Sequence, residues 1–277
     1  MAASKEHDAA FELEVQRQLK KRESRRKWML IALSVIAVAS IGYFIFYYYI
    51  ADHSDSAFGQ LADLKHSEVL NNPTPVMVDE QGVPKPILEK YQTLYNKNKS
   101  LVAWVKIEGT EIDYPVMQSV NQEYYLNHNY SQEKDKNGSI FMDKNCDAMK
   151  PSMNLIIYGH NMKSGKMFGT LERYAKSEFY EKYPMIQFDT IYEEGQYQIM
   201  YVFRSKLYSE EEIVFKYYQF VDAPTEEEFY SNMNEMAALS LYDTGVTAAY
   251  GDSLITLSTC DYQEDNGRFV VVAKKIA

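Results

Sequence analysis

The stretch SLITLSTCDYQEDNGRFVVVAKKI, from Ser253 to Ile276, decides the fold. Two runs of β-branched and apolar residues flank the polar loop DYQEDNG, and this pattern predicts a β-hairpin near the end of the chain. Cys260 ends the first run and Arg268 begins the second, so the hairpin would bring them together. Because alternate residues of a strand share a face, Ser258 is expected to point the same way as Cys260.

The region before this hairpin contains further runs that predict strands, and two that predict helices. The runs GSIFMD, MNLIIYGH and YQIMYVFRS predict further strands, and LVAWVKIEGTEIDYPVMQ predicts a hairpin that turns at Glu108-Gly109. Two helices are expected, over residues 87–98 and 223–241, the second with Thr225 as its N-cap. This order predicts a mostly β domain of seven or eight strands, closer to a closed barrel than to alternating βαβ units.

Composition and charge exclude some classes of function. The 277 residues are 46% hydrophobic, which allows a sizeable core, and two cysteines cannot form a disulfide framework. Residues 1–50 hold eight Lys/Arg against five Asp/Glu, whereas the remainder holds 21 against 34. Because phosphate binding needs a basic face, so acidic a body argues against a nucleic-acid partner.

The segment WMLIALSVIAVASIGYFIFYYYI, residues 28–50, has 23 residues and no charge. As a helix it would extend about 35 Å, enough to cross a hydrocarbon core of about 30 Å. A cleaved signal peptide is the alternative, but the apolar run is too long for one and no A-x-A site follows. Six Lys/Arg precede the segment between residues 20 and 27, which predicts a cytoplasmic N-terminus. Tyr47–Tyr49 would lie at the outer interface.

The expected topology narrows the residues that could do chemistry. Of five histidines, His7 would lie in the cytoplasm and His53 and His66 in an extended stalk, which leaves His128 and His160. His160 is the better candidate for a general acid or base, because it follows the apolar run LIIY and a glycine. The alternative is an ordinary loop histidine.

The predicted hairpin places a cation, Arg268, beside Cys260. Beyond residue 50 the only arginines are Arg173, Arg204 and Arg268. A cation beside a thiol can lower the pKa of the thiol or stabilise an oxyanion. The alternative for a free cysteine is a small buried hydrophobe.

These motifs resemble those of the sortases, the membrane-anchored cysteine transpeptidases of Gram-positive bacteria. The resemblance rests on L-S-T-C at 257–260, Arg268 on the next strand and Y-G-H-N at 158–161. Y-Y-L-N at 124–127, S-I-F-M-D at 139–143 and an acidic residue after the cysteine are similar to class B. The resemblance covers residues 55–277. It implies a closed barrel of seven to eight strands, with N-terminal helices and a helix in the long connection before the last strands.

The resemblance also implies a division of the chain and a location. Residues 1–27 would be a cytoplasmic basic tail, 28–50 a transmembrane anchor, 51–85 an extracellular stalk and 86–277 the catalytic domain. The protein is expected in the cell membrane, crossing it once with the catalytic domain outside.

The implied chemistry assigns a role to each catalytic residue. Cys260 would attack the carbonyl after the Thr of a sorting signal on a secreted protein and form a thioester. An amine on a peptidoglycan precursor would resolve it, with His160 moving the protons and Arg268 holding the oxyanion or the signal backbone.

The resemblance implies substrate contacts as well. Those expected are Ser258, Leu126, Asp261 and a tyrosine of the long connection, Tyr218 in preference to Tyr217. Gln122, with Asn121 beside it, stands where class B enzymes have an Asn. Neither a cofactor nor a metal is expected, because the acidic runs 210–212 and 226–228 lack the alternating spacing of calcium ligands.

Several alternatives stay open. Cys146 has no assigned role, and a bond between it and Cys260 is disfavoured because a nucleophile needs its thiolate. A cysteine hydrolase of the papain type is disfavoured, because its cysteine starts a helix near the start of the domain. A pilin polymerase would differ only in the amine accepted. A non-enzymatic, membrane-tethered domain that binds the cell wall would not need Cys260.

Overall fold

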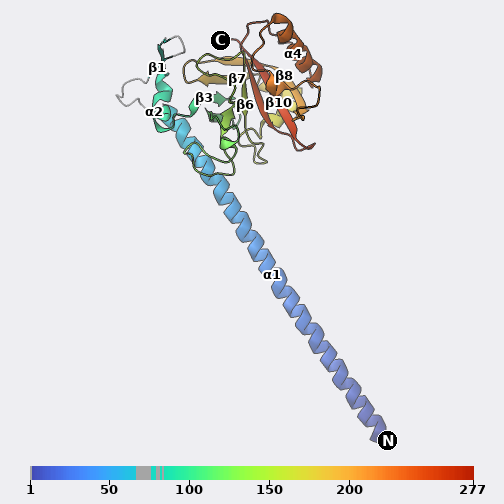
Figure 1. Cartoon of the computed structure of the whole chain (residues 1–277). Coiled ribbons are helices and arrows are strands. Elements are labelled where there is room, and N and C mark those ends of the chain that lie inside the picture. The colour runs from blue at the N-terminus through green and yellow to red at the C-terminus, as the bar shows by residue number, and fades with distance from the viewer. Residues whose placement is uncertain (1, 67–75, 79–81, 83) are drawn as a thin grey trace. The chain divides into compact units, whose positions relative to one another are not determined.

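The structure of the chain is a computed structural model that describes residues 2–66, 76–78, 82 and 84–277 (Figure 1). The chain divides into two compact units, Met1–Ala57 and Phe58–Ala277. Parts of the predicted stalk, residues 67–75, 79–81 and 83, lie outside the described residues. The four-part division of the chain stays a prediction.

The first unit is formed by the helix α1, Ala2–His66, which continues beyond it. Within α1, Gln16–Phe46 contains an 18-residue stretch with a mean hydropathy of 2.4, and the segment is long and apolar enough to be a candidate for crossing a membrane. This stretch overlaps the expected anchor and is a candidate span by length and composition. The side chains of Tyr47–Tyr49, expected at the interface, are not among those described.

Within the described residues of the second unit, eight strands close into a barrel in the order β10-β8-β7-β3-β4-β5-β6-β9, which confirms the expected fold class (Figure 1). The β4–β5 and β6–β9 pairs of this barrel are parallel, and the other pairs are antiparallel. The strands are β3 (Leu101–Lys106), β4 (Asp113–Met117), β5 (Ile140–Met142), β6 (Asn154–Tyr158), β7 (Met185–Thr190), β8 (Gln196–Lys206), β9 (Leu254–Cys260) and β10 (Gly267–Lys275).

Of the strands in the described residues, two lie outside the barrel, and one strand of the barrel was not expected. β1 (Val76–Val78) pairs with β2 (Pro84–Pro86) as a separate antiparallel ribbon in the region predicted to be a stalk. β7, whose sequence is MIQFDT, was not among the predicted strands. It joins β8 to β3, so the barrel closes through a strand that the apolar pattern did not reveal.

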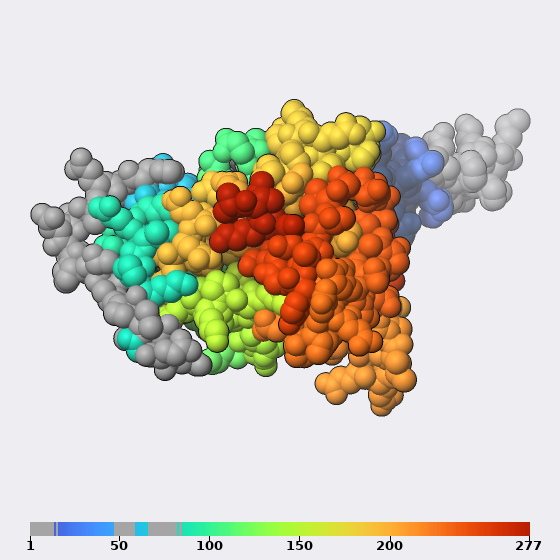
Figure 2. Space-filling model, turned by 90° about the horizontal axis from the view of Figure 1, so that it is seen from above, coloured from blue at the N-terminus to red at the C-terminus, as the bar shows by residue number. Residues whose placement is uncertain are grey.

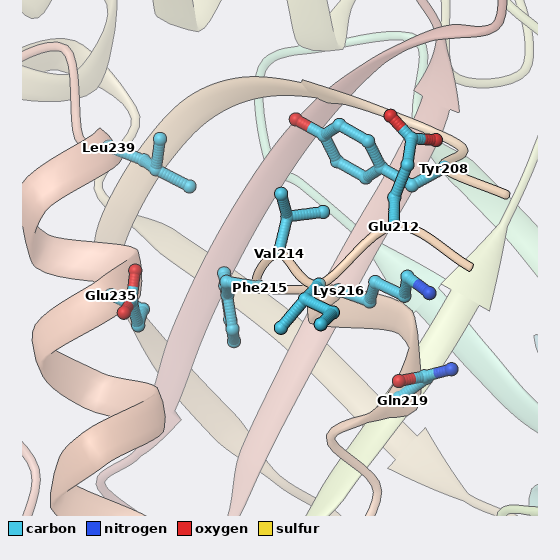
Figure 3. A pocket seen from close by; sticks show the side chains of 9 residues that line it. Tyr208, Glu212, Val214, Phe215, Lys216, Gln219, Glu235 and Leu239 are labelled. Carbon is cyan, nitrogen blue, oxygen red and sulfur yellow. The ribbon is translucent and has the colours of Figure 1, made fainter. Parts of the chain in front are cut away.

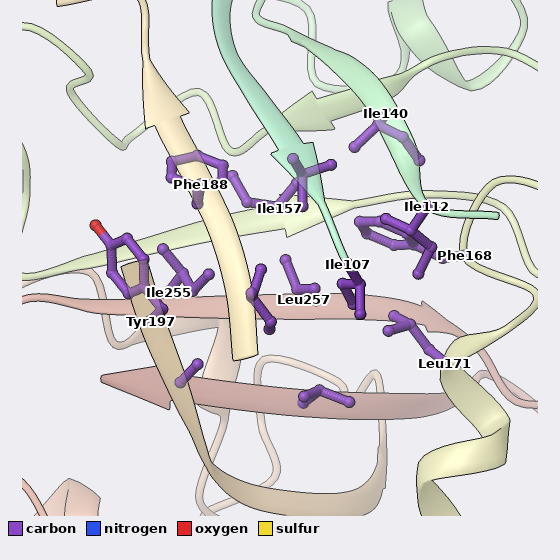
Figure 4. Packing of buried hydrophobic residues seen from close by; sticks show 14 of the residues in the cluster. Ile107, Ile112, Ile140, Ile157, Phe168, Leu171, Phe188, Tyr197, Ile255 and Leu257 are labelled. Atoms are coloured by element: carbon purple, nitrogen blue, oxygen red, sulfur yellow. The ribbon is translucent and has the colours of Figure 1, made fainter. Parts of the chain in front are cut away.

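The barrel interior is filled by aliphatic and aromatic side chains that come from strands far apart in the sequence (Figure 4). Ile157 of β6 and Ile255 and Leu257 of β9 are fully buried there, and Phe188 of β7 is 1% exposed. Burial of each such side chain contributes roughly 1.5–3 kcal/mol. The neighbouring strands β6 and β9 are therefore fixed by packing as well as by their hydrogen bonds.

Helices cover the barrel and fill its connections. They are α2 (Glu89–Lys97), α3 (Ser177–Lys182) and α4 (Glu226–Leu239), with short 3-10 turns η1 (Tyr124–Leu126), η2 (Leu171–Ala175) and η3 (Tyr217–Gln219). The expected N-cap of α4 is confirmed, because the Thr225 hydroxyl accepts the backbone N–H of Glu228 at 3.2 Å.

α4 packs on the barrel through one apolar face. Phe229, Met233 and Met236 follow helical spacing and join a buried cluster with residues of β8 and β10. In Figure 2 the residues at the C-terminal end of the chain, in dark red, lie beside the orange connection that contains α4. The long connection between β8 and β9 therefore covers part of β9, which ends at Cys260, and of β10, which begins next to Arg268.

The last turn of α1 belongs to the second unit. Leu61, Ala62 and Leu64 pack against the cluster around Trp104 and Tyr91. The Lys65 amine lies 4.9 Å from the centre of the Trp104 ring, and burial lowers the pKa of Lys65. Lys65 is 7% exposed, so this end of the helix is docked and is not a free linker.

Candidate active site

The register of β9 and β10 brings Cys260 and Arg268 together. Arg268 is the pairing partner of Cys260 in this antiparallel ladder, so the expected hairpin is confirmed. Its loop closes tightly, because the backbone N–H of Asp261 donates to the carbonyl of Gly267 at 2.9 Å. A Cβ on Gly267 would lie 2.5 Å from the carbonyl oxygen of Asp261, so only glycine fits there.

The parallel pairing of β6 with β9 brings His160 to the same edge of the sheet. Tyr158 pairs with Ser258, so His160 and Cys260 each lie two residues beyond the last pair of neighbouring parallel strands. The strands stay connected beyond that pair. The N–H of Gly159 donates to the carbonyl of Ser258 at 3.2 Å, and the Thr259 hydroxyl donates to the carbonyl of Gly159 at 2.7 Å.

The hydrogen bond of His160 determines which ring nitrogen carries a proton. Nε2 lies 2.7 Å from the carbonyl oxygen of Leu126. A carbonyl can only accept, so Nε2 is the protonated nitrogen and Nδ1 is left to exchange a proton. His128, the other candidate, stacks on the Tyr124 ring at 4.0 Å, and its Nδ1 lies 2.8 Å from the Tyr124 carbonyl. His160, and not His128, extends from the strand beside Cys260.

Arg268 is held by its own loop. Its Nη1 donates to the carbonyls of Gly267 at 2.8 Å and Asn266 at 3.3 Å, and the residue is partly exposed. Burial raises the pKa of the Tyr217 hydroxyl, while its hydrogen bond with Ser258 and the positive charge of Arg268 oppose that rise. The charge of Arg268 therefore reaches the Tyr217 hydroxyl, which bonds to Ser258 of β9.

The other two arginines beyond residue 50 have different partners. Arg204 forms an ion pair with the buried carboxylate of Asp261, and its guanidinium lies 5.1 Å from the centre of the Phe269 ring. Arg173 stacks over the Phe179 ring at 4.3 Å. Arg268 is thus the arginine that the ladder places opposite Cys260.

The residues expected to bind substrate fall into two groups. Leu126 is 39% exposed and Tyr218 is partly exposed, its hydroxyl accepting the N–H of Tyr208 at 3.1 Å. Ser258 and Asp261 are buried, at 1% and 4% exposed. The assignment of all four to the substrate stays a prediction.

The two buried members already have partners within the chain. The Ser258 hydroxyl lies 2.8 Å from that of Tyr217, the tyrosine that was not preferred. The Asp261 carboxylate accepts the N–H of Gln263 at 3.0 Å besides pairing with Arg204. Gln122, in the position of the class B Asn, donates to Asp143 at 3.1 Å.

Three further residues meet at the site, and of these only Asn161, the last residue of Y-G-H-N, was named from the sequence, without a role. The side-chain amide of Asn161 donates to the carbonyl of Cys260 and to the carboxylate of Glu172, each at 2.8 Å. The Tyr262 hydroxyl donates to the carbonyl of Asn161 at 3.0 Å. Because Asn161 directly follows His160 in the sequence, its position could have pointed to the site. Nothing in the sequence connects Glu172 to the site.

Cys146 is a buried thiol remote from this chemistry. It is 5% exposed, lies 3.5 Å from the carbonyl of Asn154 and accepts the N–H of Ile156 at 3.4 Å. Burial raises the pKa of Cys146 to about 12, which makes it a poor nucleophile. Both cysteines are free in the structure.

A cavity of about 660 Å³ lies along the connection between β8 and α4 (Figure 3). Its walls include Val214, Phe215 and Leu239, with Glu212 and Lys216 beside them. Cys260, His160 and Arg268 are not among the residues that line this cavity. Among the described residues, no group of three or more His, Cys, Asp or Glu side chains is placed to hold a metal ion.

Comparison with known proteins identifies the family of the chain. The family described as Sortase domain matches residues 105–276. Sortase B of Staphylococcus aureus is 31% identical over 246 residues, which is 88% of this chain and 94% of that protein.

Two solved structures extend the comparison. Sortase B of Bacillus anthracis has a TM-score of 0.68 at 28% identity, covering 83% of this chain and 99% of that one. A Staphylococcus aureus sortase B-substrate complex has a TM-score of 0.62 at 33% identity, covering 69% and 86%. The chain therefore belongs to the sortase family, and within it to the class B sortases, which are cysteine transpeptidases.

Proposed function

We propose that this class B sortase cleaves a C-terminal sorting signal after its Thr and transfers the acyl group to an amine of a peptidoglycan precursor. One observation carries the proposal. The main-chain register places Arg268 opposite Cys260 and brings His160 to the same level on the adjacent strand. A thiol, a cation and a proton carrier at one sheet edge are the groups that acyl transfer from a peptide bond requires.

In the first half-reaction the Cys260 thiolate attacks the carbonyl carbon of the Thr. The resulting oxyanion lies against Arg268, whose guanidinium has donors beyond the Nη1 bonds to its own loop. The C–N bond then breaks, and the leaving amine takes a proton from Nδ1 of His160. The products are a thioester on Cys260 and the released C-terminal peptide.

In the second half-reaction an incoming amine attacks the thioester and gives a proton to Nδ1 of His160. The C–S bond breaks, the thiolate of Cys260 is restored and the new bond is an amide. Throughout, Nε2 of His160 keeps its bond to the Leu126 carbonyl, which holds the ring in one orientation while Nδ1 changes its protonation state.

The expected partners follow from this reaction. The acyl donor is a secreted protein with a C-terminal sorting signal, and the acceptor is an amine of the cell-wall precursor. The predicted anchor, residues 28–50, overlaps the candidate span Gln16–Phe46 and holds the enzyme in the membrane as a single span. The basic residues 20–27 keep the N-terminus in the cytoplasm, so the catalytic domain is outside, where both partners are.

Cleavage of quenched peptides of LPxTG and NPxTN type tests the proposal. Cys260→Ala should abolish cleavage, and Cys146→Ala, a matched removal of the other thiol, should leave it intact. Turnover by Cys260→Ala would rule out the thioester route. Loss of activity in Cys146→Ala would show that the roles of the two thiols are assigned wrongly.

Product analysis tests the acceptor. With a primary amine added, mass spectrometry should detect the new amide at the Thr carboxyl, at the expense of the free acid. If only the acid forms with every amine tried, the enzyme is a hydrolase of this signal.

A further inference from the structure

The peptide plane that follows Cys260 is held at both of its polar groups. Its carbonyl oxygen accepts the side-chain amide of Asn161 at 2.8 Å. Its N–H, which belongs to Asp261, donates to the carbonyl of Gly267 at 2.9 Å. One bond comes from the loop that carries His160 and the other from the strand that carries Arg268. Together they fix the rotation of the backbone on either side of this peptide.

The nitrogen and oxygen of the Asn161 side-chain amide cannot exchange places. Its nitrogen directs two donors at two acceptors, the Cys260 carbonyl and the Glu172 carboxylate, each at 2.8 Å. A flipped amide would place an oxygen against both of these oxygens, which is unfavourable. Asn161 is 8% exposed, so water does not easily replace either bond.

The backbone of Asn161 is fixed as well. Asn161 forms an isolated antiparallel bridge with Met167, and its carbonyl accepts the Tyr262 hydroxyl at 3.0 Å. The preceding carbonyl, that of His160, accepts the N–H of Phe168 at 3.0 Å. The Asn161 side chain therefore extends from a rigid loop, and a carbonyl bound to it cannot drift far.

From these contacts we propose that Asn161, oriented by Glu172, is a positioning residue that locks the peptide after Cys260 and so directs the thiol toward the scissile carbonyl. The proposal rests on Cys260 as the nucleophile. Beyond the last pair of the β6–β9 ladder, Tyr158 and Ser258, the bonds of Gly159 to Ser258 and Thr259 join the two strands, but neither bond reaches Cys260. A further connection is needed to hold Cys260 at a constant separation from His160. Asn161 supplies that connection, because it is part of one loop and binds the main chain of the other.

The expected effect is on turnover and not on substrate affinity. A misplacement of about 1 Å in a reacting group can cost roughly 10²-fold in rate. Asn161→Ala should therefore lower kcat roughly 10²-fold and leave KM unchanged. Glu172→Ala should lower kcat less, because Asn161 keeps its bond to the Cys260 carbonyl. Glu172→Gln should retain activity, because its side-chain oxygen can accept the same proton.

The experiment measures peptide cleavage by the detergent-solubilised full chain for the wild type, Asn161→Ala, Glu172→Ala, Glu172→Gln and the Asn161/Glu172 double alanine variant. If Glu172 acts through Asn161, its replacement by Ala has no further effect in the Asn161→Ala background. Gln92→Ala is the matched control. It also removes a buried side-chain amide, which donates to the backbone carbonyl of Ile87 at 3.1 Å and not to any group of Asn161, Glu172 or Cys260. It should lose stability and keep its kcat.

The outcomes separate this inference from the proposed function. A wild type that cleaves nothing, or a Cys260→Ala variant that still cleaves, would refute the proposed function. Wild-type kcat in Asn161→Ala, beside an inactive Cys260→Ala, would overturn the positioning role alone. If Asn161→Ala does not fold, the Glu172 pair decides: equal kcat in Glu172→Ala and Glu172→Gln would also overturn it.

Discussion

The buried bond between Ser258 and Tyr217 distinguishes a structural from a substrate-binding role for Ser258. The two hydroxyl oxygens are 2.8 Å apart, and both residues are 1% exposed, so no water can substitute for a lost partner. Removing one hydroxyl leaves the other buried and unpaired, which costs about 1–3 kcal/mol. Removing both costs less than the sum of the single losses, because no unpaired group remains.

These magnitudes can be measured on the compact unit that begins at Phe58. Trp104 is the single tryptophan in that fragment and is 1% exposed, so its fluorescence reports unfolding. Ser258→Ala and Tyr217→Phe should each lower the free energy of unfolding by about 2 kcal/mol, or Tm by about 4–8 °C for a domain of this size. The double variant should show a coupling of about 1 kcal/mol or more. Phe keeps the ring contacts of Tyr217 with Phe203 and Tyr218.

The same variants report on function. If the Ser258 hydroxyl serves only to hold Tyr217, Ser258→Ala and Tyr217→Phe should change KM for a sorting peptide equally little. A rise of KM in Ser258→Ala alone, with additive losses of stability, would refute the structural role and support the predicted contact with the signal.

Three further predictions concern the catalytic groups and the second thiol. Arg268→Lys should lower kcat/KM roughly 10²–10³-fold, because a point charge replaces a planar fork of donors; near-normal activity would remove the oxyanion role. His160→Ala should lower kcat/KM roughly 10²–10⁴-fold, because the leaving amine loses its proton donor; an unchanged rate would return His160 to an ordinary loop residue. The fold raises the pKa of Cys146 from its ordinary 9.0 to about 12, so folded chains hold this proton more tightly than unfolded ones and stability falls as pH rises through that range. In Cys146→Ala that fall should be less steep by up to one proton, about 1.4 kcal/mol per pH unit, and equal slopes would contradict the assignment.

Local patterns predicted the parts of the fold that lie close together in the sequence. The β9–β10 hairpin was visible because two apolar runs share one short polar loop, and the N-cap of α4 because Thr225 precedes three glutamates. The parallel pairing of β6 with β9 joins residues about a hundred positions apart, and no local pattern encodes it. The strand β7 was missed because its polar residues, Gln187, Asp189 and Thr190, interrupt the apolar run.

The site, like the fold, was predicted only where its residues lie close together in the sequence. The hairpin pattern placed Arg268 beside Cys260, whereas the roles of both, and of His160, came from the resemblance to sortases. Sequence could not decide between the adjacent Tyr217 and Tyr218, because which of the two faces the core depends on how η3 packs against β9. Nor could it reveal that Asp261 is buried against Arg204, which is carried by another strand.

The parallel register of β6 and β9 separates the reacting groups from the long connection that precedes β9. Cys260, His160 and Arg268 are aligned by main-chain pairing among β6, β9 and β10, and none of these ladders includes residues 207–253. Insertions or deletions within that connection that keep its contacts with the barrel would therefore leave the register of Cys260, His160 and Arg268 unchanged. Several contacts limit this freedom: the apolar face of α4 packs on the barrel, the Asn154 side-chain amide donates to the Phe220 carbonyl at 2.8 Å, and the Tyr217 hydroxyl bonds to Ser258. The exposed part of this connection can thus vary in sequence and length while the three groups stay in register.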